Sequence, residues 1–564
     1  MRIRANRSLL LCLVPGLLLI ASPLVCSARE PVHARNAMVV AQEPLAADVG
    51  VAVLKAGGNA VDAAVAIGFA LAVTYPYAGN IGGGGFMLAR FVDGRTTFVD
   101  FRETAPAGAS RNMYLDADGK MTKASLVGWR AAGVPGSVRG FELAQKKYGR
   151  KSWKDVLQPA VQLAEKGYPV SYYFEKQLNS DRELLGRFPE SKRLFADLHY
   201  GDTLVQPELA QTLKRIRDHG AADFYEGETA RRLVTAMTEN GGLITLEDLK
   251  NYKAVERAPL TGHYKGLEVI TSPPPSSGGI GILQMLGMLE GSGYEKSGAG
   301  SAAQIHYVAE AMRRYYADRS EFLGDPEFVK VPVSQLLDPR YMALRRATIN
   351  LDHATPSGDV HAGPLVGKES SETTHYNVMD AEGNVVEVTY TLNAGFGSGV
   401  TAPGLGFLLN DEMDDFAGKP GTPNLFGLIQ GEANAIQPGK RPLSSMTPTL
   451  LVRDGKPYLA VGAPGGSRII NGVLQVILNV VDFHMNVQEA VDWPRIHHQW
   501  MPDLLYLEHG VSPDTVDRLR AMGHNLAPAE ATIPVIARVE AILLDGGWYQ
   551  GATDGRGNAK AAGY

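Results

Sequence analysis

Cysteine is almost absent from this 564-residue chain, and both copies lie near its start, at Cys12 and Cys26. The first 28 residues have the layout of a secretory signal peptide: three early arginines, an apolar run from Leu9 to Ala21 and small residues at the end. That run is too short to anchor the chain across a bilayer. We predict cleavage after Ala28, which leaves no cysteine. Disulfides, thiolate nucleophiles and cysteine-ligated metals are then excluded.

Long hydrophobic runs and basic clusters are also missing from the rest of the chain. Without a later hydrophobic run, the sequence predicts a periplasmic or secreted protein with no membrane anchor once the signal is removed. A lipoprotein site at Cys26 would be preceded by Pro23, Leu24 and Val25, which fit such a site poorly. The net charge of −5 and the lack of a basic run argue against a nucleic-acid partner.

Several familiar catalytic motifs do not occur: there is no phosphate-binding loop, no H-E-x-x-H and no G-x-S-x-G. The glycine run Ile81 to Phe86 has no lysine after it, so we interpret it as a place of close backbone packing. His497 and His498 are adjacent, and neighbouring residues of a strand point to opposite faces. The sequence therefore predicts neither a metal site nor a cofactor.

The order of the segments indicates a mixed α and β protein without repeats or a clear domain boundary. Residues 45–74 read as two small-residue helices, with Gly57-Gly58 ending the first and Asn59 capping the second. The segment 152–257 is mostly helical in pattern. SPPPSSGG, at 272–279, is expected to be a rigid loop because proline excludes helix and central strand.

A hairpin is predicted where HYNVMD (375–380) and NVVEVTYTL (384–392) flank a glycine-containing turn. Folding the two strands about Glu382 opposes a threonine of one strand to a threonine of the other. Directly opposed residues share a face of the sheet, and alternation would put Asn393 on that face too. A threonine pair of this kind is also an ordinary packing contact, so the hairpin alone does not decide its role. The opposed pairs are Asp380–Asn384, Val378–Val386 and Thr373–Thr391.

Many short blocks, in order along nearly the whole mature chain, resemble the gamma-glutamyltransferase family of N-terminal nucleophile hydrolases. The blocks are AGGNAVDAAVA, GGGGF, DFRETAP, PPPSSGG, TTHYNV, TLN, NDEMDDF, KRPLSSMTPT, GAPGGSRII and the closing AAGY. The resemblance implies an α+β fold, a four-layer αββα sandwich in which two stacked antiparallel sheets are flanked by helices.

The family resemblance also implies that the chain is a precursor that cuts itself between Glu372 and Thr373. A large subunit (29–372) and a small catalytic subunit (373–564) would then share one intertwined domain. The motif match selects Thr373 rather than Thr374 as nucleophile. Its freed α-amine, with an ordinary pKa of about 7.7–8.0, would be the general base. Thr391 would orient that amine.

The same resemblance assigns a pocket for the γ-glutamyl group, which is a zwitterion. Guanidinium and hydroxyl donors suit its α-carboxylate, acidic and amide oxygens suit its α-ammonium, and glycine N–H groups suit a developing oxyanion. In that order, the implied residues are Arg102, Ser444 and Ser445; Glu412, Asp415 and Asn393; and Gly465 and Gly466.

Two positions differ from the family pattern. The loop 419–435 resembles the active-site lid, but Phe426 stands where well-known members carry a tyrosine that bonds to the asparagine matching Asn393. The lid would then lack this latch, which puts the balance of hydrolysis and transfer in doubt. Glu412 stands where some members have glutamine, and a carboxylate should hold the substrate ammonium more tightly.

The resemblance implies acyl transfer of a γ-glutamyl group from glutathione or a similar donor to water, an amino acid or a peptide. A glutaryl or cephalosporin acylase is the rival within the same fold, although a glutaryl group has no ammonium for Glu412 and Asp415. A periplasmic peptide-binding protein is the rival of another class. It would account for export but not for the TTHY hairpin.

Overall fold

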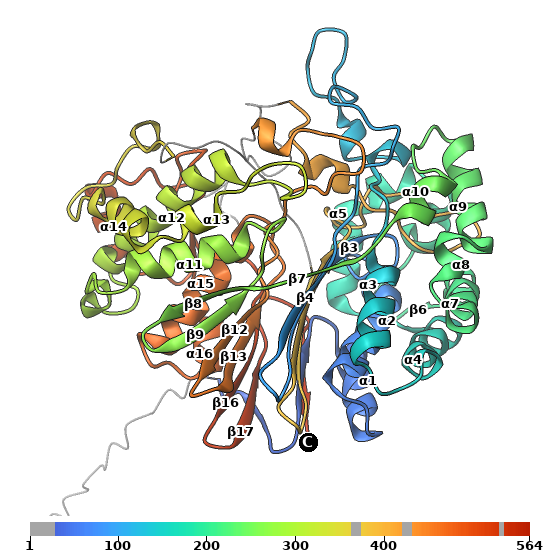
Figure 1. Cartoon of the computed structure of the whole chain (residues 1–564), viewed down its shortest axis with the longest axis horizontal. Coiled ribbons are helices and arrows are strands. Elements are labelled where there is room, and N and C mark those ends of the chain that lie inside the picture. Colours follow the sequence, from blue (N-terminus) through green and yellow to red (C-terminus); the bar gives the residue numbers. More distant parts are fainter. Residues whose placement is uncertain (1–28, 363–373, 420–430, 529–534) are drawn as a thin grey trace, which may run out of the picture.

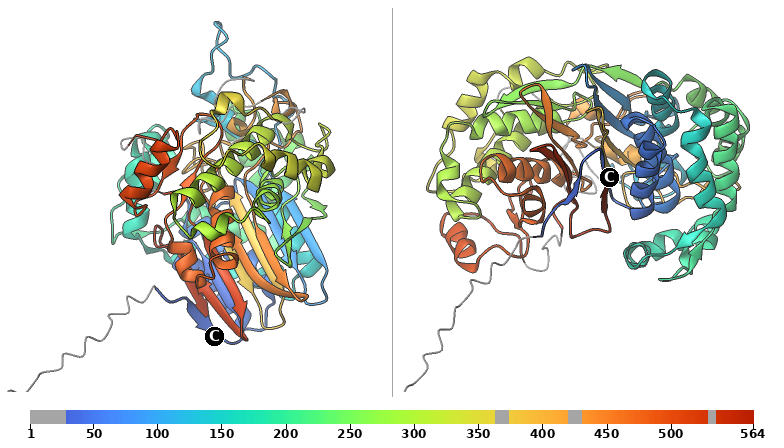
Figure 2. Two further views of the ribbon diagram at one scale, coloured as in Figure 1. Left: turned by 90° about the vertical axis from the view of Figure 1, so that its left-hand side faces the viewer. Right: turned by 90° about the horizontal axis from the view of Figure 1, so that it is seen from below.

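The computed structural model of the chain describes residues 29–362, 374–419, 431–528 and 535–564. Two seven-stranded sheets lie face to face at its centre, and a layer of helices covers the outer face of each (Figure 1). Seen from below, the two helical layers lie on opposite sides of the stacked sheets (Figure 2). The predicted α+β fold, a four-layer αββα sandwich, is confirmed.

Strands from both halves of the chain contribute to each sheet, and all neighbouring strands are antiparallel. The first sheet has the spatial order β1 (Val32–Ala34), β17 (Trp548–Ala552), β16 (Glu540–Asp545), β13 (Lys456–Gly462), β12 (Thr449–Arg453), β9 (Leu267–Thr271) and β8 (Leu260–Tyr264). The second has the order β18 (Lys560–Gly563), β2 (Met38–Ala41), β10 (Thr374–Met379), β11 (Val385–Thr391), β3 (Gly84–Arg90), β4 (Thr96–Phe101) and β7 (Val255–Arg257).

The two helical layers come from different parts of the chain (Figure 1). On the side of the second sheet lie α1 (Pro44–Lys55), α2 (Ala60–Thr74), α3 (Ser137–Tyr148), α4 (Trp153–Lys166), α5 (Tyr172–Gly186), α6 (Pro189–Ser191), α7 (Pro207–His219), α8 (Ala222–Tyr225), α9 (Glu228–Glu239) and α10 (Leu246–Asn251). On the side of the first lie α11 (Gly278–Leu289), α12 (Ala302–Phe322), α13 (Val333–Leu336), α14 (Pro339–Ala347), α15 (Arg468–Val481), α16 (Val487–Asp492) and α17 (Pro513–Ala521). Short two-stranded pairs complete the fold: β5 (Tyr168–Pro169) with β6 (Thr203–Leu204), and β14 (Ile496–His497) with β15 (Tyr506–Leu507).

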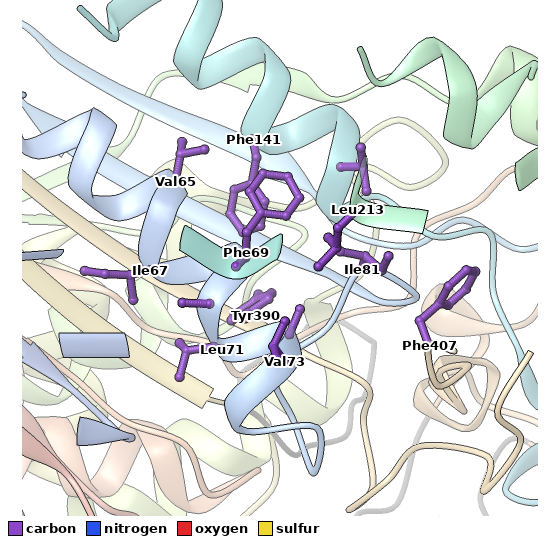
Figure 3. Close-up of a cluster of buried hydrophobic side chains, with 14 of the residues drawn as sticks. Val65, Ile67, Phe69, Leu71, Val73, Ile81, Phe141, Leu213, Tyr390 and Phe407 are labelled. Atoms are coloured by element: carbon purple, nitrogen blue, oxygen red, sulfur yellow. The ribbon is translucent and has the colours of Figure 1, made fainter. Parts of the chain in front are cut away.

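The two helices predicted within residues 45–74 are confirmed. Gly57 ends the first with a φ of 84°, and Asn59 forms a capping box with Asp62 at the start of the second. Every residue of α2 is buried, so this helix forms the centre of one core, shown in Figure 3. The predicted loop 272–279 is shorter than expected, because α11 already begins at Gly278.

The predicted hairpin is present as β10 and β11, and its register agrees with the prediction over the described residues. Val378 lies opposite Val386, and the Asp380 N–H donates to the Asn384 carbonyl at 3.0 Å. Gly383 takes the positive φ that the turn needs, at 92°. β10 pairs on its other edge with β2 and β11 with β3, so the hairpin occupies the middle of its sheet.

The two faces of the hairpin have different partners. Tyr376 and Tyr390 donate their hydroxyls at 2.8 Å to carbonyls of α2, so their face packs on the helices. Asn377 points the other way and donates to the Glu540 carbonyl of β16 in the facing sheet at 2.9 Å. By alternation, Thr391 lies on this second face, between the sheets.

No helix among residues 29–362, 374–419, 431–528 and 535–564 has the length and hydrophobicity needed to span a membrane. The predicted signal peptide, residues 1–28, lies outside the described residues, as do Glu372, Thr373 and Phe426.

Candidate active site

Thr391 ends β11 and is held on several sides. The Asn80 side chain donates to its carbonyl at 2.7 Å, and the Asn393 N–H donates to its hydroxyl at 2.8 Å. Gly83 lies so close that a Cβ there would overlap the Thr391 carbonyl oxygen. The glycine run is thus a site of close backbone packing, as predicted. These contacts fix the threonine hydroxyl at the open end of the hairpin.

Thr374, the first described residue after the predicted cut, lies opposite Tyr390 and therefore on the helix-facing side of the hairpin. Its hydroxyl is buried, with no hydrogen-bond partner in the described part of the chain. Thr374 therefore does not share the face of Thr391. The predicted nucleophile, Thr373, lies outside the described residues.

The loop after β13 lies at the same end of the sandwich as the hairpin opening. Gly462, the last residue of β13, is so close to His375 that an added Cβ would overlap its ring. Three residues later, Gly465 and Gly466 have φ values of 138° and 68°, which side chains disfavour. Their carbonyls accept hydrogen bonds in the first turn of α15, whereas their N–H groups have no acceptor among the described residues. Two N–H donors are thus available near the start of β10.

Arg102 follows directly after β4 and is buried, with an exposure of 1%. Its guanidinium forms ion pairs with both Glu412 and Asp415. It also donates to the carbonyls of Pro442 and Leu443, at 3.2 and 3.3 Å. The cation and the two acids predicted for opposite ends of the zwitterion are therefore in direct contact with one another.

The buried cluster around Arg102 holds more carboxyl groups than this one cation can pair with. Glu103 lies 3.6 Å from the guanidinium, and burial raises the pKa of its carboxyl to about 7. Burial, together with repulsion from Glu103 and Asp415, raises the pKa of Glu412 well above its usual range. Both oxygens of Glu103 and Oε2 of Glu412 are buried, without hydrogen-bond donors among the described residues. An additional cation would relieve this cluster.

Asn393 borders the same cluster through Asp411, but not for the predicted reason. β11 ends at Thr391, and Asn393 has a φ of 78°, so strand alternation does not place it. Its side-chain N–H instead donates to Asp411, at 3.1 Å to the carbonyl and 3.2 Å to the carboxyl group. Its Oδ1 is buried, and no described residue donates to it. This oxygen is a possible acceptor for a ligand.

Ser444 and Ser445 follow the two carbonyls that bind Arg102, so they line the same region. The Ser444 hydroxyl accepts from the Met446 N–H at 3.2 Å, and the Ser445 hydroxyl accepts from Arg319 at 2.7 Å. The sequence reasoning missed Arg319, which lies far away in the chain, and Glu103. The second could have been found, since an acid adjacent to a buried arginine in DFRETAP is a natural partner for it.

The two adjacent histidines are engaged with protein groups. His497 contacts the Asn471 and Gln499 side chains at 2.8 and 2.9 Å, and His498 contacts Asp503 at 3.3 Å. Burial lowers the pKa of His497 to about 3 and that of His498 to about 4.

A family model described as gamma-glutamyltranspeptidase matches residues 46–564. The chain is 50% identical over 535 residues to a glutathione hydrolase proenzyme of Escherichia coli (strain K12), covering 93% of this chain and 91% of the relative. It is 39% identical over 510 residues to the acylase ACY 1 proenzyme of Pseudomonas sp. (strain V22), covering 88% of each. Its structure is similar to that of a cephalosporin acylase from Bacillus halodurans, with a TM-score of 0.86 and 27% identity over 96% of this chain and 98% of the other.

The family match spans nearly the whole described fold, and the site residues lie within it. The resemblance inferred from sequence blocks is thereby confirmed, and so is the enzymatic character of the chain. The chain is an enzyme of the gamma-glutamyltranspeptidase family.

Proposed function

We propose that this chain is an exported, self-processing gamma-glutamyltransferase. Residues 1–28 would direct export to the periplasm or the medium. Cleavage between Glu372 and Thr373 would then give subunits 29–372 and 373–564. The mature enzyme would transfer the γ-glutamyl group of glutathione or a related donor to water, an amino acid or a peptide.

The observation that carries this proposal is the acid-rich cluster around Arg102. The donor brings one ammonium and one carboxylate, so it adds a cation to a cluster that has an excess of carboxyl groups. The ammonium would bind Glu412, Asp415 and the oxygen of Asn393, which accepts no hydrogen bond from a described residue. Arg102, Ser444 and Ser445 would bind the carboxylate, with the guanidinium shared between the donor and the pocket acids.

The self-cleavage would use the hydroxyl of Thr373. Its oxygen attacks the carbonyl carbon of Glu372, the C–N bond breaks, and an ester replaces the peptide bond. Water hydrolyses the ester, which leaves a carboxylate on Glu372 and a free α-amine on Thr373. The placement of Thr391 on the inter-sheet face supports its proposed role of orienting that amine.

Transfer would repeat the same chemistry on the donor. The Thr373 hydroxyl attacks the γ-carbonyl carbon, and its proton passes to the α-amine and then to the departing amine. Gly465 and Gly466 would donate their N–H groups to the oxyanion that develops on the carbonyl oxygen. Water or an acceptor amine then attacks the γ-glutamyl ester and releases the enzyme.

A glutaryl acylase activity is the second candidate, because acylases are among the relatives of this chain. A glutaryl group has the distant carbonyl and the carboxylate but no ammonium. It would bring a further negative charge to the acidic pocket without a compensating cation. We therefore expect γ-glutamyl p-nitroanilide to be cleaved much faster than glutaryl p-nitroanilide, and the reverse preference would favour the acylase.

Intact-mass measurement tests the processing. The wild-type protein should give two fragments, with the smaller beginning at Thr373. Thr373→Ala should remain one folded, inactive chain, whereas Thr373→Ser should be cut and keep part of the activity. Thr391→Ala should slow cutting or turnover without unfolding the protein.

Thr374→Val is the matched control for the nucleophile. The Thr374 hydroxyl is buried without a partner among the described residues, so an isosteric apolar side chain should be tolerated. This variant should be cut normally. Cutting in Thr373→Ala together with an intact Thr374→Val chain would transfer the role to Thr374. The same spectra check export, since removal of the signal should leave Arg29 as the first residue.

A further inference from the structure

Arg319 of α12 lies behind the two pocket serines. It is buried, with an exposure of 1%. Its Nη2 donates to the Ser445 hydroxyl at 2.7 Å, and its Nε donates to the Ser277 hydroxyl at 3.0 Å. Ser277 in turn donates to the Ser444 carbonyl from both its N–H, at 2.7 Å, and its hydroxyl, at 2.9 Å. One guanidinium thus supports both serines, one directly and one through Ser277.

The same face of α12 also contacts the loop with the glycine N–H donors. Tyr315 and Tyr316 lie four and three residues before Arg319, which puts all three on neighbouring positions of the helix surface. Tyr315 donates to the Ser277 carbonyl at 3.1 Å, and Tyr316 donates to the carbonyl of Ser467, next to Gly466. One helical turn therefore contacts both Ser277, which binds the loop of Ser444 and Ser445 (the serine loop), and Ser467, which follows Gly465 and Gly466 (the glycine loop).

The direction of the bond between Arg319 and Ser445 matters for a ligand. A guanidinium has only donors, so the Ser445 oxygen must be the acceptor. Its own hydrogen then points away from Arg319. A carboxylate bound beside the serines would compete for that hydrogen, because donation to an ionised group is stronger than donation to a neutral one.

The charge of the pocket gives a second reason for an additional cation. Arg102 already faces the carboxyl groups of Glu103, Glu412 and Asp415. A donor carboxylate would therefore approach a cluster in which three carboxyl groups share the single guanidinium of Arg102. Burial lowers the pKa of Arg319, and its neighbours, Asp415 among them, oppose this shift. The charge of Arg319 is thus felt within the same cluster.

We propose that Arg319 is a positioning residue for the α-carboxylate of the donor: it orients the Ser445 hydroxyl toward that carboxylate and supplies a second buried positive charge behind it. This inference rests on the proposed function, because it presumes a γ-glutamyl donor. It assigns a role in donor selectivity to a residue of the large subunit, remote in the sequence from every motif of the pocket.

Two donors that differ only in the α-carboxylate test the inference. γ-Glutamyl p-nitroanilide carries it, and 4-aminobutanoyl p-nitroanilide keeps the ammonium and the scissile amide but lacks it. Arg319→Met should lower kcat/KM for the first donor by about 10- to 100-fold, mainly through KM, since a charge-assisted hydrogen bond is lost. The second donor should change by less than about threefold.

Three variants separate positioning from general damage. Arg319→Lys keeps the charge but cannot bind Ser277 and Ser445 together as a fork, so it should give an intermediate loss and remains informative if Arg319→Met does not fold. In a Ser445→Ala background, Arg319→Met should cost clearly less than it does in the wild type, because the two residues act together. Arg345→Met removes another arginine bound to α12, through Asp318 at 2.9 Å and the Arg314 carbonyl at 2.7 Å, and should leave the ratio of the two donors unchanged.

Equal losses for both donors in Arg319→Met and Arg319→Lys, or a wild-type ratio in both, would overturn the inference while the proposed function stands. A wild-type enzyme that cleaves the γ-glutamyl donor no better than the 4-aminobutanoyl donor would overturn the proposed function, and this inference with it.

Discussion

Two buried ionic clusters of this enzyme differ in balance, and the difference separates a structural network from a ligand site. On α12, Glu310 lies between Arg313 and Arg314, with contacts of 3.0 and 2.6 Å. Burial alone would raise the pKa of Glu310, but the two arginines outweigh it and lower that pKa. Around Arg102 the ratio of acidic to basic side chains is reversed, because three carboxyl groups face one guanidinium. The pKa values of Glu103 and Glu412 are accordingly raised. The arginines balance the first cluster, whereas the second holds more carboxyl groups than its guanidinium can pair with.

The largest effect should come from breaking the balanced cluster. Glu310→Ala leaves two buried arginines without their shared counter-charge, which should cost about 3–5 kcal/mol of stability. Chemical denaturation of the uncut Thr373→Ala protein, with and without Glu310→Ala, measures this. A loss below about 1 kcal/mol would mean that the cluster is not structural.

Neutralising the acid-rich cluster around Arg102 should affect the donor more than the fold. The double variant Glu412→Gln/Asp415→Asn should lower kcat/KM for a γ-glutamyl donor by about 100-fold, since a desolvated ammonium loses its counter-charges. Its stability should fall less than that of Glu310→Ala, because Glu103 remains beside Arg102. Glutaryl p-nitroanilide should lose far less, and equal losses for the two donors would contradict the pocket assignment.

The two clusters should also respond to pH in opposite directions. Glu103 has a pKa raised from 4.5 to about 7, so the stability it contributes at low pH is lost as the pH rises from 4.5 to about 7. Glu310 has a lowered pKa, so its contribution is present above 4.5 and lost as the pH falls through its folded-state pKa. Thermal unfolding, relative to the parent protein, should reveal the Glu103→Gln effect between pH 4.5 and 7 and the Glu310→Gln effect below pH 4.5, with opposite trends.

The same titration should appear in donor binding. An ionised Glu103 adds to the field that holds the donor ammonium, so KM should fall by up to roughly tenfold between pH 6 and 8. Glu103→Gln should flatten this part of the pH dependence of KM. The variant therefore distinguishes the titration of Glu103 from that of the Thr373 amine. An identical profile in both proteins would exclude Glu103 as its source.

The smallest predicted effect concerns Phe426. A hydroxyl at this position could donate to the Asn393 oxygen that has no partner among the described residues. One neutral hydrogen bond shifts an equilibrium a few-fold, up to roughly tenfold. Phe426→Tyr should therefore change the ratio of hydrolysis to transfer, measured with and without a dipeptide acceptor, and leave processing unaffected. An unchanged ratio would mean that Phe426 does not govern acceptor access.

How well the sequence predicts a contact depends on how far apart the two residues lie in the chain. The hairpin register and the Asn59 cap depend on neighbours in the chain, and both were predicted correctly. The contact of Arg102 with Glu412 and Asp415 joins segments some 300 residues apart, so the sequence suggested the residues but not that they bind one another. Arg319 lies in α12, and nearly all residues of this helix are buried. Only the packing of α12 against the serine loop reveals its place.

The position of the hairpin within its sheet has a consequence for the lifetime of the enzyme. β10 would become the first element of the small subunit, yet it is bonded along one edge to β2 of the large one, as β11 is to β3. Denaturing the processed enzyme would therefore release two chains that must find each other again to rebuild the centre of a sheet. The precursor folds as one chain. The lifetime of the cut enzyme would instead be set by the height of its barrier to unfolding.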